Sequence, residues 1–328
     1  MPRFMRPLPG ALLGAAAASL LALGCGEKKT DTAPTTPAPV SGGAVDWTIS
    51  GTLVANPDAQ PIGGASITVT GGSPVTSNAA GQFSISGAGT QPVGLRVSIS
   101  ASGYLRRDTS IQAGSSRNGL VIDLIRDSAP FSLPFYREIA RSSLDGALRT
   151  TRRWHQDPSF YIQTIDENGT DVPQFFIDSA TSVITDIVTD VTAGRYRADR
   201  IETGISTAQP APGTIRIWFP AASIGAAGIA SGIGVNPCTV RVWQGDVPSA
   251  VTRVIAHEIG HCLGLGHITV TGLPPTPEGL MGKFGYGSWK LPRLTDAEKF
   301  HAAILYSRPD GNADLDIDPT SWLFSVIR

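Results

Sequence analysis

Residues 257–267 read His-Glu-Ile-Gly-His-Cys-Leu-Gly-Leu-Gly-His, and this window holds three of the chain's five histidines. On a helix, His257 and His261 project from one face a single turn apart, where both imidazoles can reach one metal ion. The helix must end before His267, because otherwise this third imidazole would point away from the first two. Gly264 permits that break, since glycine accepts the left-handed conformation. The window therefore predicts a helix, a tight turn and one zinc ion held by three histidines.

Glu258 follows the first of these ligands directly. A carboxylate at this position takes a proton from a water that the metal activates, the arrangement that H-E-x-x-H hydrolases share. We therefore expect Glu258 to act as the general base and Zn²⁺ to be the cofactor.

The longer pattern H-E-x-x-H-x-x-G-x-x-H is complete in this chain, and it resembles the metzincin clan of zinc endopeptidases. That clan also carries a methionine in a tight turn beneath the zinc ligands. The segment Gly279-Leu-Met281-Gly is similar to this turn and has its methionine fourteen residues after His267. The resemblance thus implies that Met281 is the methionine of the turn.

A third likeness lies further along, where Leu294-Thr-Asp-Ala-Glu298 opens a predicted helix that ends in Ile-Leu-Tyr306. It is similar to the C-terminal helix of the matrixin branch, and Thr295 with Glu298 predicts a capping box at its start. The resemblance implies that Glu298 bonds to the methionine turn.

Some family features are absent from the sequence. It has no cysteine-switch segment and no second His-rich zinc motif, so neither latency nor a structural zinc is implied. Tyr286 is a candidate contact to the scissile carbonyl, with ordinary packing as the alternative.

The N-terminus reads as an export signal over residues 1–24, with Arg3 and Arg6 before an apolar run. The alternative is a transmembrane anchor, but the run is shorter than the ~20 residues that span a bilayer. The run ends in Leu-Ala-Leu-Gly-Cys25, which resembles a bacterial lipobox. Acylated Cys25 would tether the protein to the cell envelope, with Gly26 favouring the outer membrane. Simple secretion is the alternative.

The domain organisation follows from changes in composition. Residues 25–44 are Pro/Thr/Ala-rich and predict a disordered tether. Residues 45–126 alternate apolar and polar side chains between glycine turns, which predicts an all-β sandwich. They resemble the transthyretin-like carboxypeptidase regulatory-like domain in segments such as Gly51-Thr-Leu-Val and Gly81-Gln-Phe, with a generic immunoglobulin-like sandwich as the alternative.

Residues 127–328 suit the zinc metalloprotease domain, so the fold class expected for the chain is α+β. By resemblance this is a metzincin-type zincin domain with a twisted mixed sheet, an active-site helix and a C-terminal helix. Strands are predicted from Phe160, Thr214 and Thr239. One helix is predicted with Pro173 in its first turn, and another after Pro248. The Gly/Ala-rich stretch 221–236 predicts a loop.

Two cysteines remain if Cys25 is acylated, and in an exported chain Cys238 and Cys262 invite a disulfide. The alternative for Cys262 is a small buried apolar side chain. His155 and His301 lie outside the motif and are expected at the surface or in the core rather than on a metal.

Residues 310–318 alternate acidic side chains as a Ca²⁺ loop does. They lack its glycine at position six and its glutamate at position twelve, so a solvated tail is preferred.

The composition excludes a nucleic-acid partner, because the net charge is −1 and basic residues are dispersed. The expected partners are a protein or peptide substrate and, through the lipid anchor, a membrane. We expect a monomer. The favoured function is zinc-dependent endopeptidase. One alternative is an exported surface or adhesion module with a structural zinc, and another is zinc hydrolysis of a non-protein amide such as cell-wall peptide.

Overall fold

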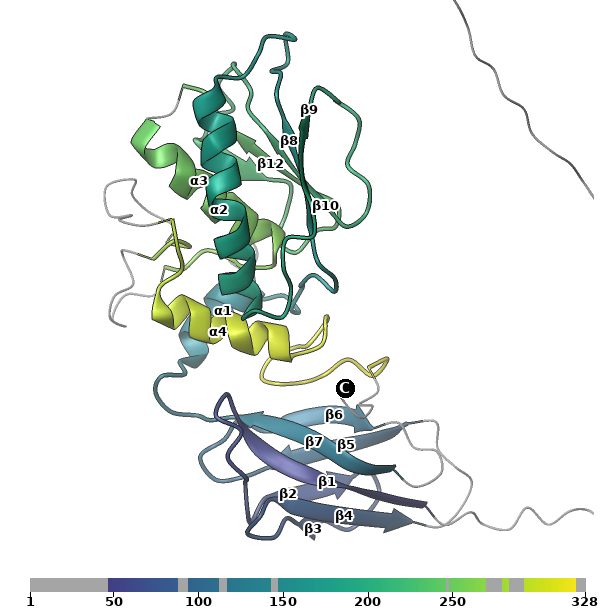
Figure 1. Ribbon diagram of the computed structural model, residues 1–328. Coiled ribbons are helices and arrows are strands. Elements are labelled where there is room, and N and C mark those ends of the chain that lie inside the picture. Colours follow the sequence, from purple (N-terminus) through teal and green to yellow (C-terminus); the bar gives the residue numbers. More distant parts are fainter. Residues whose placement is uncertain are drawn as a thin grey trace, which may run out of the picture. The chain divides into compact units, whose positions relative to one another are not determined.

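The computed structural model describes residues 47–87, 94–111, 117–142, 147–245, 248–269, 279–282 and 292–322. Within these ranges the chain is mixed α and β, with twelve strands and four helices (Figure 1). The buried apolar side chains divide into two hydrophobic cores, one among the first seven strands and one around the later strands and the helices.

The first seven strands form two sheets. One has the order β4 (Gln82–Gly87), β1 (Trp47–Asn56), β7 (Arg117–Ile125), and β1 runs antiparallel to β4 and parallel to β7. The other has the order β3 (Val75–Thr76), β2 (Ser66–Val69), β5 (Leu95–Ser100), β6 (Arg107–Ile111). Alternate side chains of β1 and β5 are buried, and side chains from both sheets share one core. The period-two pattern in the sequence has this physical origin.

The later strands form a five-stranded mixed sheet in the order β11 (Gly228–Ala230), β12 (Cys238–Val242), β10 (Thr214–Trp218), β8 (Ser159–Gln163), β9 (Ile201–Gly204). All neighbours are parallel except β11, which runs antiparallel to β12 at one edge. The sequence predicted a loop throughout 221–236, and for β11 this was wrong. Glycine and alanine have low strand propensity, but pairing with β12 overrides it.

Four helices accompany this sheet: α1 (Leu133–Arg141), α2 (Gln174–Thr192), α3 (Pro248–Cys262) and α4 (Asp296–Ser307). α2 packs against α3, and α3 packs against β11 and β12 (Figure 1). Pro173 is the residue before α2 rather than part of its first turn, so this start was predicted slightly too early. The histidine helix α3 is thus held between a sheet edge and a second helix.

The start of α4 is specified locally. Thr295 and Glu298 form the predicted capping box, in which each side chain accepts a hydrogen bond from the other residue's backbone N–H. Near its other end, the Tyr306 hydroxyl donates to the carbonyl of Leu263 at 2.8 Å. This bond joins α4 to the residue that directly follows α3.

The prediction of a solvated acidic tail was wrong. Asp316 and Asp318 are 0% and 1% exposed. Arg308 donates to both carboxylate oxygens of Asp316 at 2.7 Å, and Arg107 on β6 donates to Asp318 at 2.9 Å. Asp123 on β7 accepts from both arginines. We call these five residues the acid–arginine cluster. Its carboxylates bind guanidinium groups, and the described residues hold no acidic group of Ca²⁺ ligands.

No helix in the described part of the chain combines the length and the apolar character needed to cross a membrane. Cys25, the leader and the tether all lie outside the described residues.

Candidate functional site

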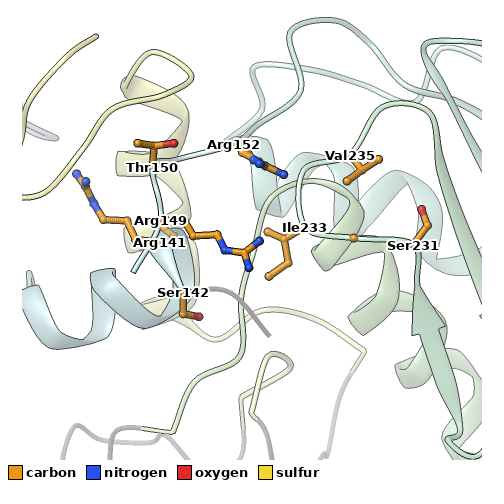
Figure 2. Close-up of a pocket in the computed structure, with 10 residues that line it drawn as sticks. Arg141, Ser142, Arg149, Thr150, Arg152, Ser231, Ile233 and Val235 are labelled. Carbon is orange, nitrogen blue, oxygen red and sulfur yellow. The ribbon is translucent and has the colours of Figure 1, made fainter. Parts of the chain in front are cut away.

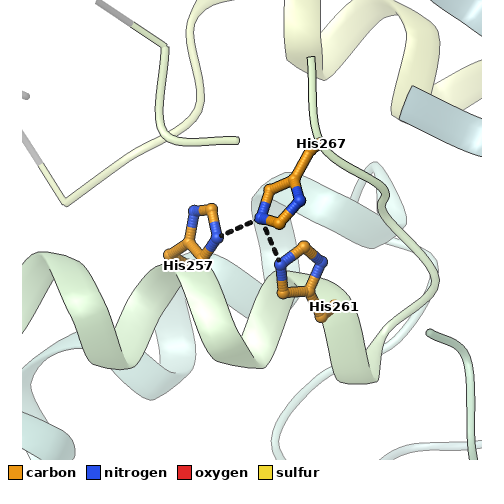
Figure 3. Close-up of side chains that lie close together, drawn as sticks. All are labelled: His257, His261 and His267. Atoms are coloured by element: carbon orange, nitrogen blue, oxygen red, sulfur yellow. Dashed lines mark hydrogen bonds between the residues drawn. The ribbon is translucent and has the colours of Figure 1, made fainter. Parts of the chain in front are cut away.

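Three imidazoles converge at the end of α3. His257 and His261 lie one turn apart on this helix and are 5% and 4% exposed, and His267 returns from the turn that follows. The Nε2 atom of His267 is 3.1 Å from that of His257 and 3.1 Å from that of His261 (Figure 3). Among the described residues this is the one group of such side chains placed to hold a metal ion. The three histidines can therefore bind a metal together, as the spacing predicted.

The turn that brings His267 back depends on Gly264. Its φ of +112° lies in the region that favours glycine, and a Cβ there would lie 2.2 Å from the carbonyl oxygen of Arg152. Trp154 caps the same helix end, because its indole N–H donates to the carbonyl of Cys262 at 2.8 Å. Any larger side chain at position 264 would clash with the backbone of Arg152, so either the turn or that segment would have to shift.

The proton positions of two ligands are fixed by backbone carbonyls. Nδ1 of His257 lies 2.6 Å from the oxygen of Leu280, and Nδ1 of His261 lies 2.7 Å from the oxygen of Leu265. A carbonyl oxygen can only accept, so each Nδ1 carries the proton and each Nε2 presents a lone pair. Both imidazoles are thus oriented and in the tautomer that binds a metal through Nε2.

Burial keeps the same two imidazoles uncharged. It lowers the pKa of His257 to about 4, with the Leu280 hydrogen bond opposing that shift. Burial also lowers the pKa of His261 well below its ordinary value, and the neighbouring His257 and His267 lower it further. Neutral imidazole is the form that binds metals, so both groups are ready to bind at neutral pH.

The close approach of the nitrogens favours a cation between them. His267 has at most one proton on Nε2, and that proton can point directly at only one of the two neighbouring lone pairs, each 3.1 Å away. At least one pair of nitrogens therefore faces lone pair to lone pair. In a tetrahedral site with bonds of ~2.0–2.1 Å the ligand nitrogens are about 3.3 Å apart, close to the spacing found. The residues fit a tetrahedral metal.

Glu258 is a residue of α3, and its side chain lies against the edge strand β11. It is 7% exposed, and a Cβ on Gly228 would lie 2.9 Å from its Oε1 atom. Burial raises the pKa of Glu258 to about 8, and a hydrogen bond from the Ala230 N–H opposes this. The carboxylate is therefore next to the path of any extended chain that lies along β11.

The methionine turn lies beneath the ligand helix. Met281 is fully buried, and a Cβ on Gly260 would lie 2.8 Å from its sulfur, so Gly260 permits this contact. Glu298 accepts from the Met281 N–H at 2.7 Å and from the Leu280 N–H at 3.2 Å, the bonds that the resemblance implied. Because Leu280 also orients His257, Glu298 acts on that ligand through the turn.

A disulfide joins Cys238 to Cys262. It connects the first residue of β12 to the last residue of α3, directly after His261, and both cysteines are fully buried. The end of the ligand helix is thus covalently attached to the sheet.

The other candidate residues lie elsewhere. His155 is exposed near Asp310, and His301 is buried, accepting from the Ser132 N–H at 3.0 Å and donating to the Ala297 carbonyl at 2.7 Å. Neither belongs to the metal group. Tyr286 lies outside the described residues. The sequence did not reveal the carbonyls of Leu265 and Leu280, although both residues stand inside the motifs that were quoted.

Comparison with known proteins gives no family. No protein-family profile matches the chain, and no curated protein does. Solved structures that it partly resembles include chlorocatechol 1,2-dioxygenase from Pseudomonas putida, at 8% identity over 25% of this chain and 60% of that chain, with a TM-score of 0.19. A second is a putative membrane-associated protein of unknown function from Bacteroides fragilis, at 17% identity over 46% of this chain and 45% of that chain, with a TM-score of 0.21. A third is the Bacillus anthracis TIE protein, at 12% identity over 39% of this chain and 24% of that chain, with a TM-score of 0.17. The chain spans less than two thirds of each of these structures, and such low scores carry no argument about fold or function.

Proposed function

We propose that this chain is a zinc-dependent endopeptidase with a metzincin-type, matrixin-like catalytic domain. One observation carries the proposal: the Nε2 atoms of His257, His261 and His267 converge while backbone carbonyls hold the Nδ1 protons of the first two. Three neutral nitrogen ligands are the set that catalytic zinc uses, because they leave the fourth position open. Among the described residues the metal-binding group consists of these three histidines.

When bound, zinc supplies a Lewis acid that polarises the scissile carbonyl and lowers the pKa of water toward ~7. The chain's own residues supply the rest. Glu258 takes a proton from the attacking water and later delivers it to the departing amine. Its place beside Gly228 supports this role, because a peptide lying along β11 passes this carboxylate.

The strand β11 supports an extended substrate. It is the last strand at one edge of its sheet, and the bonds from Trp243 to Ala227 and from Ser231 to Thr239 fix the alternation of its backbone groups. By that alternation Gly228 and Ala230 direct their N–H and C=O groups away from β12, and of these the Ala230 N–H already donates to Glu258. A peptide backbone can pair with such an edge as an added strand.

The test uses the full chain loaded with zinc and a mixed peptide library. We expect cleavage that a chelator abolishes and added zinc restores. Glu258→Gln should keep one zinc per molecule and lose activity by 10²- to 10⁴-fold, roughly the contribution of a general base. His155→Gln, which changes an exposed histidine, is the matched control and should stay within about twofold. A zinc-loaded Glu258→Gln protein with full activity would overturn the assignment of the base.

We also propose that the protein is a lipid-anchored component of the bacterial cell envelope, with residues 45–126 as a transthyretin-like accessory domain. The lipobox-like segment that ends at Cys25 supports the anchor. Incorporation of labelled fatty acid into the parent protein and its loss in Cys25→Ser is the expected result. A Cys25→Ser protein that still takes up label would refute the anchor.

A further inference from the structure

The segment that carries the third metal ligand lies beyond the end of the ligand helix. His257 and His261 are residues of α3, whereas His267 follows the turn after Cys262, the last residue of that helix. Its Nε2 atom nevertheless lies 3.1 Å from those of both helical histidines. The position of His267 therefore depends on the partners of the backbone on either side of it.

Helix α1 binds this backbone both before and after His267. Before it, the Gly266 N–H donates to the carbonyl of Ile139 at 2.7 Å. After it, the Thr269 N–H donates to Oε2 of Glu138, and the Thr269 hydroxyl donates to Oε1 at 2.5 Å. One carboxylate thus binds both donors of Thr269, and two consecutive residues of α1 hold the stretch that carries the ligand.

The end of α1 also packs closely against this stretch. A Cβ on Gly266 would lie 2.6 Å from the carbonyl oxygen of Glu138 and 2.6 Å from the Oγ atom of Ser142. The Ser142 hydroxyl donates to the same Glu138 carbonyl at 2.6 Å, which satisfies one of the groups that the end of α1 leaves without a helical partner. Packing and hydrogen bonds therefore place the same end of α1 against the segment of His267.

Helix α1 is itself attached to the residues that follow α4. Arg137 donates to the two carboxylate oxygens of Asp314 at 3.1 and 2.6 Å. Arg141 lines a pocket of about 340 Å³ beside the loop between β11 and β12, but in Figure 2 it points away from Ile233. Its guanidinium donates instead to the side-chain and backbone oxygens of Asn312 at 2.5 and 3.2 Å. A bond from α1 thus connects the ligand segment to the rest of the fold.

The methionine turn supplies a further bond, from the Ile268 N–H to the carbonyl of Met281 at 2.9 Å. This bond and the bond to Ile139 join backbone to backbone, so they do not require a particular side chain at either position. The contact of Glu138 differs from both, because it depends on a side chain that can accept at two oxygens. Glu138 is therefore the position at which a substitution tests the support of His267.

We propose that Glu138 is a positioning residue of the zinc site, which holds His267 against α3 by accepting both donors of Thr269. This inference rests on the proposed function, and it gives a role to a helix that lies outside the histidine motif. Groups that orient a metal ligand contribute about 10- to 100-fold to metal affinity. Glu138 acts through the backbone of Thr269 and not on an imidazole, so we expect the lower end of that range.

The experiment measures the zinc affinity of the full chain by competition with a chromophoric chelator, and the visible absorption of the Co²⁺-loaded chain. Glu138→Ala should weaken zinc binding about tenfold and alter the Co²⁺ absorption, which depends on the arrangement of the ligands. Glu138→Gln should stay within about threefold of the parent, because its amide oxygen accepts from the Thr269 N–H and its NH₂ group donates to the hydroxyl. Glu202→Ala removes an exposed carboxylate that pairs with Arg200, and this control should leave both readouts unchanged.

Thr269→Val tests the other end of the contact. It removes the hydroxyl donor and keeps the N–H, so we expect a smaller loss of zinc affinity, roughly threefold. In the Glu138→Ala background the same change should cause no further loss, because the partner of the hydroxyl is already absent. Thr269 is exposed, so this variant tests the contact even if Glu138→Ala does not fold.

A role in stability alone predicts other results. If Glu138→Ala lowers the stability of the metal-free chain in urea but keeps the parent's zinc affinity and Co²⁺ absorption, the positioning role is wrong. Losses that add in full between Glu138→Ala and Thr269→Val would also refute it. None of these measurements requires catalysis. A chain that binds zinc and cleaves no peptide would refute the endopeptidase, while weaker zinc binding by Glu138→Ala would still support the positioning role.

Discussion

The three-histidine site and the acid–arginine cluster are both buried and polar, but they avoid the energetic cost of burying an unpaired charge in opposite ways. In the first, burial lowers the pKa of His257 to about 4 and the group stays neutral. In the second, burial would raise the pKa of Asp123, but Arg308 and Arg107 outweigh it and hold that pKa well below its usual range. One cluster avoids charge, and the other pairs it.

This difference decides what each cluster needs from outside. The arginines and carboxylates of the second cluster hydrogen-bond to one another, with Asn312 donating to both Asp316 and Asp318. The histidines instead leave lone pairs facing each other across 3.1 Å. The hydrogen bonds of the acid–arginine cluster are therefore made within the chain, whereas the three histidines are placed to hold a metal ion.

A substitution in the three-histidine site should have the largest effect on zinc content and activity. His261→Ala removes a ligand whose Nε2 meets the other two, so we expect most of the zinc to be lost on dialysis. Peptidase activity should fall by about 10³-fold or more, since the metal contributes several kcal/mol to the reaction. Metal analysis, activity and circular dichroism measure the three quantities together. A folded variant that retains one tightly bound zinc would contradict the three-ligand site.

A substitution in the acid–arginine cluster should lower the stability of the fold and leave the zinc content unchanged. Arg308→Met leaves Asp316 buried without its cation, and we expect a loss of about 3–5 kcal/mol in the free energy of unfolding by urea. Arg106→Met removes an exposed partner of Asp108 and should change stability by less than about 1 kcal/mol. Zinc per folded molecule should stay the same in both. An Arg308 variant as stable as the Arg106 variant would mean that the cluster adds nothing.

The disulfide offers a third test of this comparison, because it attaches α3 to the sheet but contributes no ligand to the histidine site. Cys238→Ala/Cys262→Ala opens a link between residues separated by 24 positions, for which chain entropy gives about 3 kcal/mol. We expect lower stability in urea and an unchanged zinc content at saturating zinc. If the zinc content also falls under saturation, the disulfide is a requirement of the site and not only of the fold.

The smallest expected effect is the loss of stability at low pH that is due to Asp123. The folded pKa of Asp123 is depressed, so its contribution to stability is present above the unfolded value of about 3.9 and is lost as pH falls below it. The parent protein should therefore lose on the order of 1 kcal/mol more than Asp123→Asn between pH 5 and pH 3. Urea unfolding across this range gives the difference. Parallel curves for the two proteins would show that Asp123 is not the titrating group.

Local signals in the sequence were sufficient where the partners are close along the chain. The spacing of His257 and His261, the break at Gly264 and the capping box of Thr295 and Glu298 all depend on a few neighbouring residues, and the structure has each of them. The alternation in β1 and β5 likewise followed from one buried face.

Partners that are remote along the chain were missed. Asp318 is buried because Arg107, more than two hundred positions earlier, donates to it, and no local pattern contains that pair. An alternating acidic segment has the same composition whether water or arginines surround it. For the same reason the sequence did not reveal the pocket beside the loop between β11 and β12, which is lined by residues around Arg149 and Ile233. An arginine placed in a strand with a largely buried face, as Arg107 is in β6, was the one available signal.

The hydrogen bonds of Glu298 couple the folding of α4 to the geometry of the histidine site. One carboxylate starts α4, accepts both N–H groups of the methionine turn, and through the Leu280 carbonyl determines where His257 keeps its proton. Fraying of α4 would therefore remove the support of His257, which lies 41 positions earlier in the chain, and the three histidines would no longer converge. A truncation that removes α4 should for this reason abolish metal binding completely and not reduce it by degrees.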